Sequence, residues 1–89
     1  MADTPKGFAL FQAEVIAVKG ECEAGHVKGQ KITLSCWDAS ELCGYFYHDI
    51  FPSLQTLQFG GTIPWSPDGV LTLECPDRHN AVTIRLAKK

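Results

Sequence analysis

The sequence has no long hydrophobic run, so a membrane-spanning helix is not expected. No apolar stretch in its 89 residues approaches the ~20 residues that a membrane span requires. Residues 1–7 are polar and lack the apolar centre of a secretory signal peptide. We therefore expect a cytoplasmic protein that has no membrane partner and whose residues 1–7 are flexible.

Positive charge is also scarce and dispersed. Eight basic and ten acidic residues are interspersed along the chain and give a formal net charge of −2. Proteins that bind nucleic acids usually gather Lys and Arg in a patch or stripe, and here only Lys88 and Lys89 stand side by side. Nucleic acid is therefore not an expected partner.

The motifs of several enzyme classes are missing as well. The chain has no Gly-x-Gly-x-x-Gly dinucleotide loop, no phosphate-binding loop, no metalloprotease motif and no nucleophile elbow. Its acidic residues form no cluster that would indicate a paired-carboxylate site. It also lacks a Cys-x-x-Cys pair, the strongest spacing for a zinc finger. These absences leave any reaction unspecified.

What is present is the composition of one globular domain. Hydrophobic residues make up 45% of the chain and charged residues 20%, which argues against extended disorder. The length is typical of a single domain, and no repeat or linker interrupts it. We therefore expect residues 1–89 to form one domain.

Hydrophobic alternation predicts four strands. Residues 8–19 and 31–36 alternate between apolar and polar with a period of two, which is typical of half-buried strands. Residues 70–75 and 81–87 alternate in the same way, and the turn-forming residues 76–80 between them predict a β-hairpin. In the first strand, the expected inward face consists of Phe11, Ala13, Val15 and Ala17.

One helix is predicted between the second and third strands. The sequence Asp38-Ala-Ser-Glu41 is typical of a capping box, which begins a helix. Apolar residues then recur at the spacing of an amphipathic helix, at Leu42, Phe46, Ile50, Leu54 and Leu57. Pro52 should kink or split this helix, and Gly60-Gly61 should end it.

The order of these elements, β-β-α-β-β, predicts the fold class. An amphipathic helix and half-buried strands must each cover an apolar face. We therefore expect an α+β fold in which a small, mainly antiparallel sheet carries one helix on one face, with a kink at Pro52.

Cysteine and histidine supply the most pointed chemistry in the chain. Three cysteines each precede a histidine by a few residues, namely Cys22 and His26, Cys43 and His48, and Cys75 and His79. Thiolate and imidazole are preferred ligands of zinc and of softer metals, and cytoplasmic thiols are normally reduced. The pattern indicates a metal or thiol site, with chance proximity as the alternative interpretation.

The first two pairs differ in how easily they can act together. Cys22 and His26 share a loop that can bring both side chains to one point, or else the loop is simply solvated. On a regular helix, Cys43 and His48 lie about 140° apart, which favours an exposed His48. If the helix begins at Gly44, Cys43 becomes the cap residue at the positive end of the helix dipole. Otherwise Cys43 is a buried apolar side chain.

The remaining candidates have simpler expected places. Cys75 ends a strand on its inward face, from where the sulfur can reach the core or a site at the end of the sheet. Cys36 is expected in the core, and His79 is expected to be exposed in the hairpin turn. Trp65 follows Pro64 in a glycine-containing loop and is expected either to wall a small-molecule pocket or to seal the core.

Four motifs together resemble a known family. They are Cys22-x-x-Gly-His26, Leu42-Cys43, Phe59-Gly-Gly-x-x-Pro-Trp65 and Cys75-Pro-Asp77. In this order, over residues 10–87, the chain resembles a family of small uncharacterised prokaryotic proteins of about this length. That family has no established activity, so the resemblance implies no reaction. Two positions depart from its pattern: Gln30 stands where an acidic residue is expected, and Gly44 where proline is frequent.

The resemblance implies one shared site built from the motif positions. The expected metal ligands are Cys22, His26, Cys43 and Cys75, with His48 as a substitute. The expected pocket residues are His48, Trp65 and Asp77. Three thiolates and one imidazole fit zinc in a closed tetrahedral site, and three or four cysteines also anchor iron–sulfur clusters. Cys36 and His79 do not match motif positions.

We therefore expect a small metal-binding domain that holds zinc or an iron–sulfur cluster and works with a protein partner. Two alternatives stay open. One is a small enzyme with an open metal position or a reactive thiol, in which Cys43 is the nucleophile and His48 or His26 the base. The other is a metal-free module for protein interaction.

Overall fold

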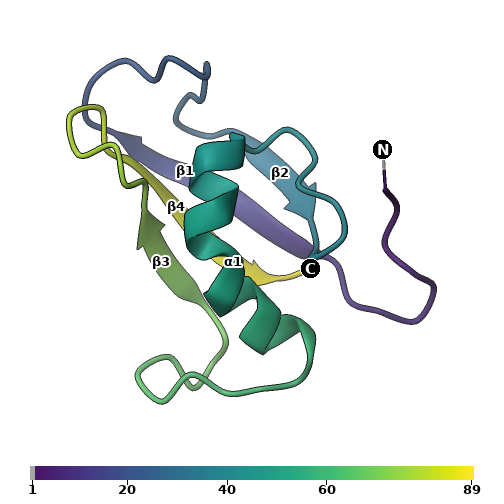
Figure 1. Cartoon of the computed structure of the whole chain (residues 1–89). Coiled ribbons are helices and arrows are strands. Elements are labelled where there is room, and N and C mark those ends of the chain that lie inside the picture. The colour runs from purple at the N-terminus through teal and green to yellow at the C-terminus, as the bar shows by residue number, and fades with distance from the viewer. Residues whose placement is uncertain (1) are drawn as a thin grey trace.

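The computed structural model describes residues 2–89 and confirms the α+β fold with the predicted order of elements. The strands are β1 (Phe11–Val18), β2 (Lys31–Leu34), β3 (Leu71–Glu74) and β4 (Val82–Lys88), and the helix is α1 (Gly44–Gln58). All strand pairs are antiparallel, in the spatial order β2-β1-β4-β3. The helix lies across one face of this single sheet (Figure 1).

Alternation along the strands sends apolar side chains toward the helix. In β4 the buried residues are Val82, Ile84 and Leu86, and Arg85 between them is exposed. The helix meets the sheet with side chains one turn apart, at Phe46, Ile50 and Leu54, all of which are buried. Burying one such side chain contributes about 1.5–3 kcal/mol relative to leaving it exposed. This helix–sheet layer is therefore the core of the domain.

A β-bulge corrects one detail of the predicted first strand. The register pairs Val15 with Ile84 but Ala17 with Thr83, which leaves Ile16 as an extra residue. An extra residue reverses the inward–outward alternation beyond it. Ala17 is therefore exposed, although the period of two predicted that it would face inward.

The helix begins later than the capping-box pattern predicts. Its N-cap is Cys43, and Gly44 is its first residue, as in the alternative considered from the sequence. The carboxylate of Asp38 accepts a hydrogen bond from the backbone N–H of Ser40 at 2.8 Å, which makes a local turn. Ser40 has a φ of 55°, and this left-handed conformation is incompatible with a helix that starts at Asp38.

The helix runs through Pro52 to its predicted end without splitting, although proline removes one backbone hydrogen bond there. The backbone N–H of Gly60 donates to the carbonyl of Leu57 at 3.3 Å, and that of Gly61 donates to Thr56 at 2.8 Å. This is the Schellman pattern, and Gly60 supplies the φ of 82° that it needs. The glycine pair therefore ends the helix as predicted.

Three loops or turns come together at one end of the sheet. They are residues 19–30 after β1, residues 75–81 between β3 and β4, and the start of α1 (Figure 1). Residues 59–70 lie at the other end. No helix within residues 2–89 is long and apolar enough to cross a membrane.

Candidate functional site

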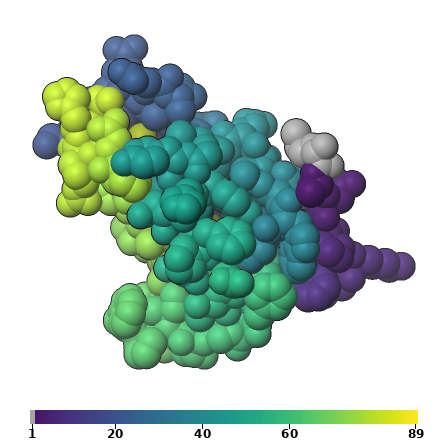
Figure 2. Space-filling view, viewed as in Figure 1, coloured from purple at the N-terminus to yellow at the C-terminus, as the bar shows by residue number. Residues whose placement is uncertain are grey.

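One pocket is lined by three of the four cysteines. Its volume is about 580 Å³, and its walls are formed by Cys22, Glu23, Ala24, Cys43, Tyr45, Cys75 and Asp77. The three cysteines come from three separate segments, whose surfaces meet beside the first turn of α1 (Figure 2). All are free thiols, with Cys75 buried and the other two partly exposed. The end of the sheet thus concentrates sulfur donors that lie far apart in the sequence.

Cys75 is the buried cysteine of this pocket. It follows β3 directly, its backbone N–H donates to the carbonyl of Val82 at 2.8 Å, and it is 7% exposed. Burial raises the pKa of its thiol; the backbone N–H of Asp77 lowers the pKa by donating to the sulfur, whereas negative charge on Cys43 and Cys22 raises it. The thiol of Cys75 therefore lies close enough to Cys43 and Cys22 for their charge to affect its pKa.

Cys43 is placed by the start of the helix. As the N-cap residue it accepts the first helical hydrogen bond, from the backbone N–H of Tyr47 at 2.8 Å. Its own side chain makes no capping bond, and the first turn contains no acidic residue. The positive end of the helix dipole is therefore left without a negative side chain of its own at the wall of the pocket.

His26 is buried between the loop and the helix, and both of its ring nitrogens are engaged. Its exposure is 3%. Nε2 accepts a hydrogen bond from the backbone N–H of Cys43 at 3.0 Å. Nδ1 lies 3.0 Å from Oε1 of Gln30, and that oxygen also accepts from the backbone N–H of Val27 at 3.3 Å. Because Oε1 can only accept, Nδ1 carries the proton.

This geometry argues against the prediction that His26 is the fourth metal ligand. A metal is bound through the lone pair of a neutral imidazole nitrogen. The lone pair on Nε2 of His26 is already used by the N–H of Cys43. The ring therefore contacts the backbone of Cys43 and has no free nitrogen that could bind a metal.

His48 and Trp65 lie outside the pocket, which corrects their predicted places. His48 is on the exposed side of α1, where it borders a separate apolar depression with Tyr47, Phe51 and Pro52. Positions 43 and 48 of a regular helix point about 140° apart, so His48 faces away from the side of the helix on which Cys43 lies. Trp65 is 82% exposed in the loop after α1, so it neither walls this pocket nor seals the core.

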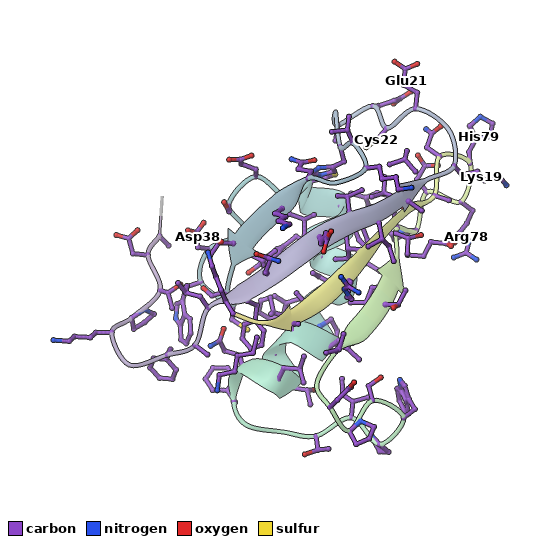
Figure 3. All side chains as sticks on the ribbon, turned by 180° about the vertical axis from the view of Figure 1, so that it is seen from behind. Lys19, Glu21, Cys22, Asp38, Arg78 and His79 are labelled. Carbon is purple, nitrogen blue, oxygen red and sulfur yellow. The ribbon has the colours of Figure 1, made fainter. Side chains whose placement is uncertain are left out.

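Asp77 organises the turn that follows Cys75. Its Oδ1 accepts from the backbone N–H groups of His79 at 3.1 Å and of Asn80 at 3.4 Å, and its Oδ2 accepts from Nδ2 of Asn80 at 3.1 Å. Desolvation raises the pKa of Asp77, but these hydrogen bonds outweigh it, and the net pKa is lowered. His79 extends outward from the turn, as predicted (Figure 3).

Asn80 joins this turn to the loop that carries Cys22. Its backbone carbonyl accepts from the N–H groups of Lys19 at 2.9 Å and Gly20 at 3.2 Å. Its side-chain Oδ1 accepts from the N–H of Glu21 at 3.2 Å. The labelled side chains of Lys19, Glu21 and Cys22 accordingly lie at the same end of the sheet as His79 in Figure 3. The position of Cys22 relative to the turn is thus set by one asparagine.

Cys36 is separate from the pocket. It packs partly buried against the core, as predicted, and its backbone N–H donates to Oε1 of Gln58 at the far end of α1, at 3.1 Å. Burial raises the pKa of its thiol. It is therefore a natural reference for the three cysteines of the pocket.

The three thiols share the pocket without forming a closed ligand set. Within residues 2–89, no three His, Cys, Asp or Glu side chains are grouped closely enough to hold a metal ion. A cysteine side chain can turn about χ1 between staggered positions, so metal binding would require such rotations. The sequence reasoning missed three residues of this region, because only their neighbours in space reveal them: Glu23, Tyr45 and Asn80. It noted Gln30 as a departure from the family pattern but assigned it no role.

No protein-family model, curated protein or solved structure matches this chain. The resemblance to the family of small prokaryotic proteins therefore stays a prediction.

Proposed function

We propose that this chain is a small metal-binding domain whose ligands are the thiolates of Cys22, Cys43 and Cys75. The supporting observation is that three cysteines from separate segments line one pocket, whereas the fourth lies elsewhere. Thiolates are preferred ligands of zinc, and three or four cysteines are the usual anchors of iron–sulfur clusters. These two groups remain the proposed cofactors.

Electrostatics supports a cation in this pocket. Burial is the largest cause that raises the pKa of the Cys75 thiol, and negative charge on Cys43, Asp77 and Cys22 raises it further. A bound cation reverses this effect, because coordination deprotonates a thiol outright. Metal binding would therefore convert the mutual repulsion of these groups into attraction and release protons.

The fourth coordination position would not come from His26. Asp77 lies in the pocket wall, and although both of its oxygens accept hydrogen bonds, a carboxylate offers about four acceptor sites. Glu23 is an exposed wall residue on the loop of Cys22. Either carboxylate, or a water molecule as in open zinc sites, would complete a tetrahedron around three thiolates.

The thiol-enzyme alternative finds less support in the geometry. A cysteine nucleophile needs a base within hydrogen-bond reach. His48 borders a different depression from Cys43, and Nε2 of His26 accepts from the backbone of Cys43. Neither imidazole is therefore placed to take a proton from the Cys43 thiol.

A protein partner is part of this proposal. Phe8, Trp37 and Phe59 form an aromatic cluster with ring centroids 4.8 to 6.2 Å apart, and two of these rings are exposed, at 44% for Phe8 and 58% for Phe59. Exposed apolar clusters are often contact surfaces. The cluster supports a domain that works beside another protein.

The decisive experiment is metal analysis of protein purified without oxygen. We expect the wild type to contain stoichiometric zinc, or else iron together with the absorption spectrum of an iron–sulfur cluster. The single variants Cys22→Ser, Cys43→Ser and Cys75→Ser should each lose most of the metal, whereas Cys36→Ser should retain it. Metal-free wild type that cannot be reconstituted with either cofactor would favour the metal-free module. If Cys36→Ser lost as much metal as the other variants, the metal would not be bound specifically in this pocket.

A further inference from the structure

We infer that His26 is a positioning residue for the metal site: together with Gln30 it holds the N-terminus of α1 so that Cys43 stays at the pocket. This inference rests on the proposed function. It assigns a role to the most deeply buried imidazole of the described chain, at 3% exposure, which the ligand set leaves without one.

The start of the helix has backbone donors that need partners from outside the helix. The N–H groups of the N-cap and first turn have no partner within a helix. In a capping box, a Glu or Gln at the third helical position accepts from the N-cap N–H. That position of α1 is Phe46, which is buried in the core. Nε2 of His26 takes over this role from another segment of the chain.

His26 is itself anchored to the sheet. Its Nδ1–H donates to Oε1 of Gln30. The backbone carbonyl of Gln30 accepts from the N–H of Val15 in β1 at 2.9 Å, and the carbonyl of Val15 accepts from Gly29 at 2.8 Å. A continuous set of hydrogen bonds therefore leads from the central strand β1 through Gln30 and His26 to the backbone of Cys43.

The ring of His26 also links two of the three segments that carry the proposed ligands. His26 follows Cys22 in a tight turn, in which the N–H of Gly25 donates to the carbonyl of Cys22 at 2.9 Å. The ring then contacts Cys43. Its loss would leave the partly buried N–H of Cys43 without an acceptor and would free the segments of Cys22 and Cys43 to move apart. Groups that orient metal ligands from behind typically change metal affinity about 10- to 100-fold.

Two substitutions of similar size separate positioning from simple packing. In His26→Gln the amide oxygen can accept from the N–H of Cys43, whereas His26→Leu fills the space without an acceptor. Each purified variant is titrated with Co²⁺ without oxygen, and the thiolate-to-cobalt absorption is recorded. Cys43→Ser provides the spectrum of a site that has lost one thiolate. His48→Ala is the matched control, because it removes an exposed histidine that borders another depression.

We expect His26→Leu to bind Co²⁺ about 10-fold more weakly than wild type or worse, with a thiolate band that approaches that of Cys43→Ser. His26→Gln should recover most of the affinity and of the band, and His48→Ala should match wild type. Wild-type binding by His26→Leu would overturn the inference, as would equal weakening of both variants with a full three-thiolate band.

Two further outcomes have defined meanings. If His26→Leu does not fold, as judged by circular dichroism, Gln30→Leu takes its place, since it keeps the ring and removes its anchor; wild-type affinity and spectrum in that variant would overturn the inference. If the wild type binds neither Co²⁺ nor Zn²⁺ and cannot be reconstituted with an iron–sulfur cluster, the inference and the proposed function fail together; if it holds only a cluster, the same variants are compared by their cluster absorption. Failure of the inference alone requires a wild type that binds and a His26→Leu variant that binds equally well.

Discussion

A methyl group on Gly20 would lie 2.5 Å from Oδ1 of Asn80 and 3.4 Å from its Cα. The two residues also share a backbone hydrogen bond, from the N–H of Gly20 to the carbonyl of Asn80. The amide of Asn80 cannot simply turn away, because it bonds to Asp77 on one side and to Glu21 on the other. The absence of a side chain at position 20 therefore lets two loops of the site meet.

The first prediction concerns this contact. Gly20→Ala forces the Asn80 side chain out of its hydrogen bonds, so the free energy of unfolding should fall by about 1–3 kcal/mol, the usual cost of overpacking. In the background of Asn80→Ala, the same change should cost clearly less, because the clashing oxygen is gone. Urea unfolding of the two single variants and the double variant measures the coupling.

Gly44→Ala is the control for this cycle. A Cβ at Gly44 would meet no atom within 4 Å, and alanine in a helix is favoured over glycine by roughly 0.5–1 kcal/mol. We expect a neutral or slightly stabilising effect. Strict additivity of Gly20→Ala and Asn80→Ala would show that the close approach does not constrain the loops.

The second prediction concerns the pH dependence that Asp77 confers. Its pKa in the folded protein is lowered by hydrogen bonds from Asn80 and His79, so the folded state binds its proton more weakly than the unfolded chain does. The resulting stability is complete above the unfolded Asp pKa of about 3.9 and is lost as the pH falls through the lowered pKa. Asp77→Asn should therefore be less stable than wild type at neutral pH, with a gap that narrows in acid. Unfolding at a series of pH values tests this, and a constant gap would contradict it.

The fold could be predicted from local patterns, since alternation in residues 31–36, 70–75 and 81–87 depends only on burial of one face. The start of the helix could not be predicted in this way. Asp38 and Ser40 have the residue types of a helix cap, but the same types also make isolated turns, and the φ of Ser40 decides between the two. Such a choice depends on how the whole segment packs.

The candidate site is less accessible to sequence reasoning, because it depends on contacts between distant segments. The resemblance implied that Cys22, Cys43 and Cys75 form one site, and the structure brings them to one pocket. The spacing of Cys22 and His26 suggested two ligands, yet the histidine nitrogens bond to Gln30 and to the backbone of Cys43. The sequence around a single histidine does not show whether its ring binds a metal or accepts a hydrogen bond from a helix N-terminus.

The third prediction concerns the reactivity of the thiols in metal-free protein. The thiolate is the nucleophile in alkylation, and burial raises the pKa of both Cys75 and Cys36. Both should reach half of their maximal alkylation rate at a pH above the unperturbed value of about 8.5. Cys43→Ser should lower the midpoint of Cys75, because it removes a neighbouring negative charge, and should leave that of Cys36 unchanged. Residue-resolved mass spectrometry measures these rates, and no shift of Cys75 in Cys43→Ser would mean that the two sulfurs do not interact.

The fourth prediction separates the stability of the fold from the integrity of the site. Gln58 is buried, its Nε2 donates to the carbonyl of Ala9 at 2.9 Å, and its Oε1 accepts from the N–H of Cys36 at 3.1 Å. Gln58→Ala leaves both backbone groups without this partner and should lower the free energy of unfolding by about 1–3 kcal/mol. The exposed Gln55 on the same helix is the matched control, and Gln55→Ala should change stability by no more than about 0.5 kcal/mol.

Gln58 and the N-cap residue Cys43 lie at opposite ends of α1, so the two should be separable by experiment. At temperatures where Gln58→Ala remains folded, it should bind Co²⁺ as tightly as wild type, in contrast to His26→Leu. Reduced affinity in Gln58→Ala would mean that metal binding reports the stability of the whole domain. In that case weaker Co²⁺ binding by His26→Leu would not by itself show a positioning role. The number of thiolates indicated by its spectrum would still do so, because that number depends on the position of Cys43 and not on the stability of the folded state.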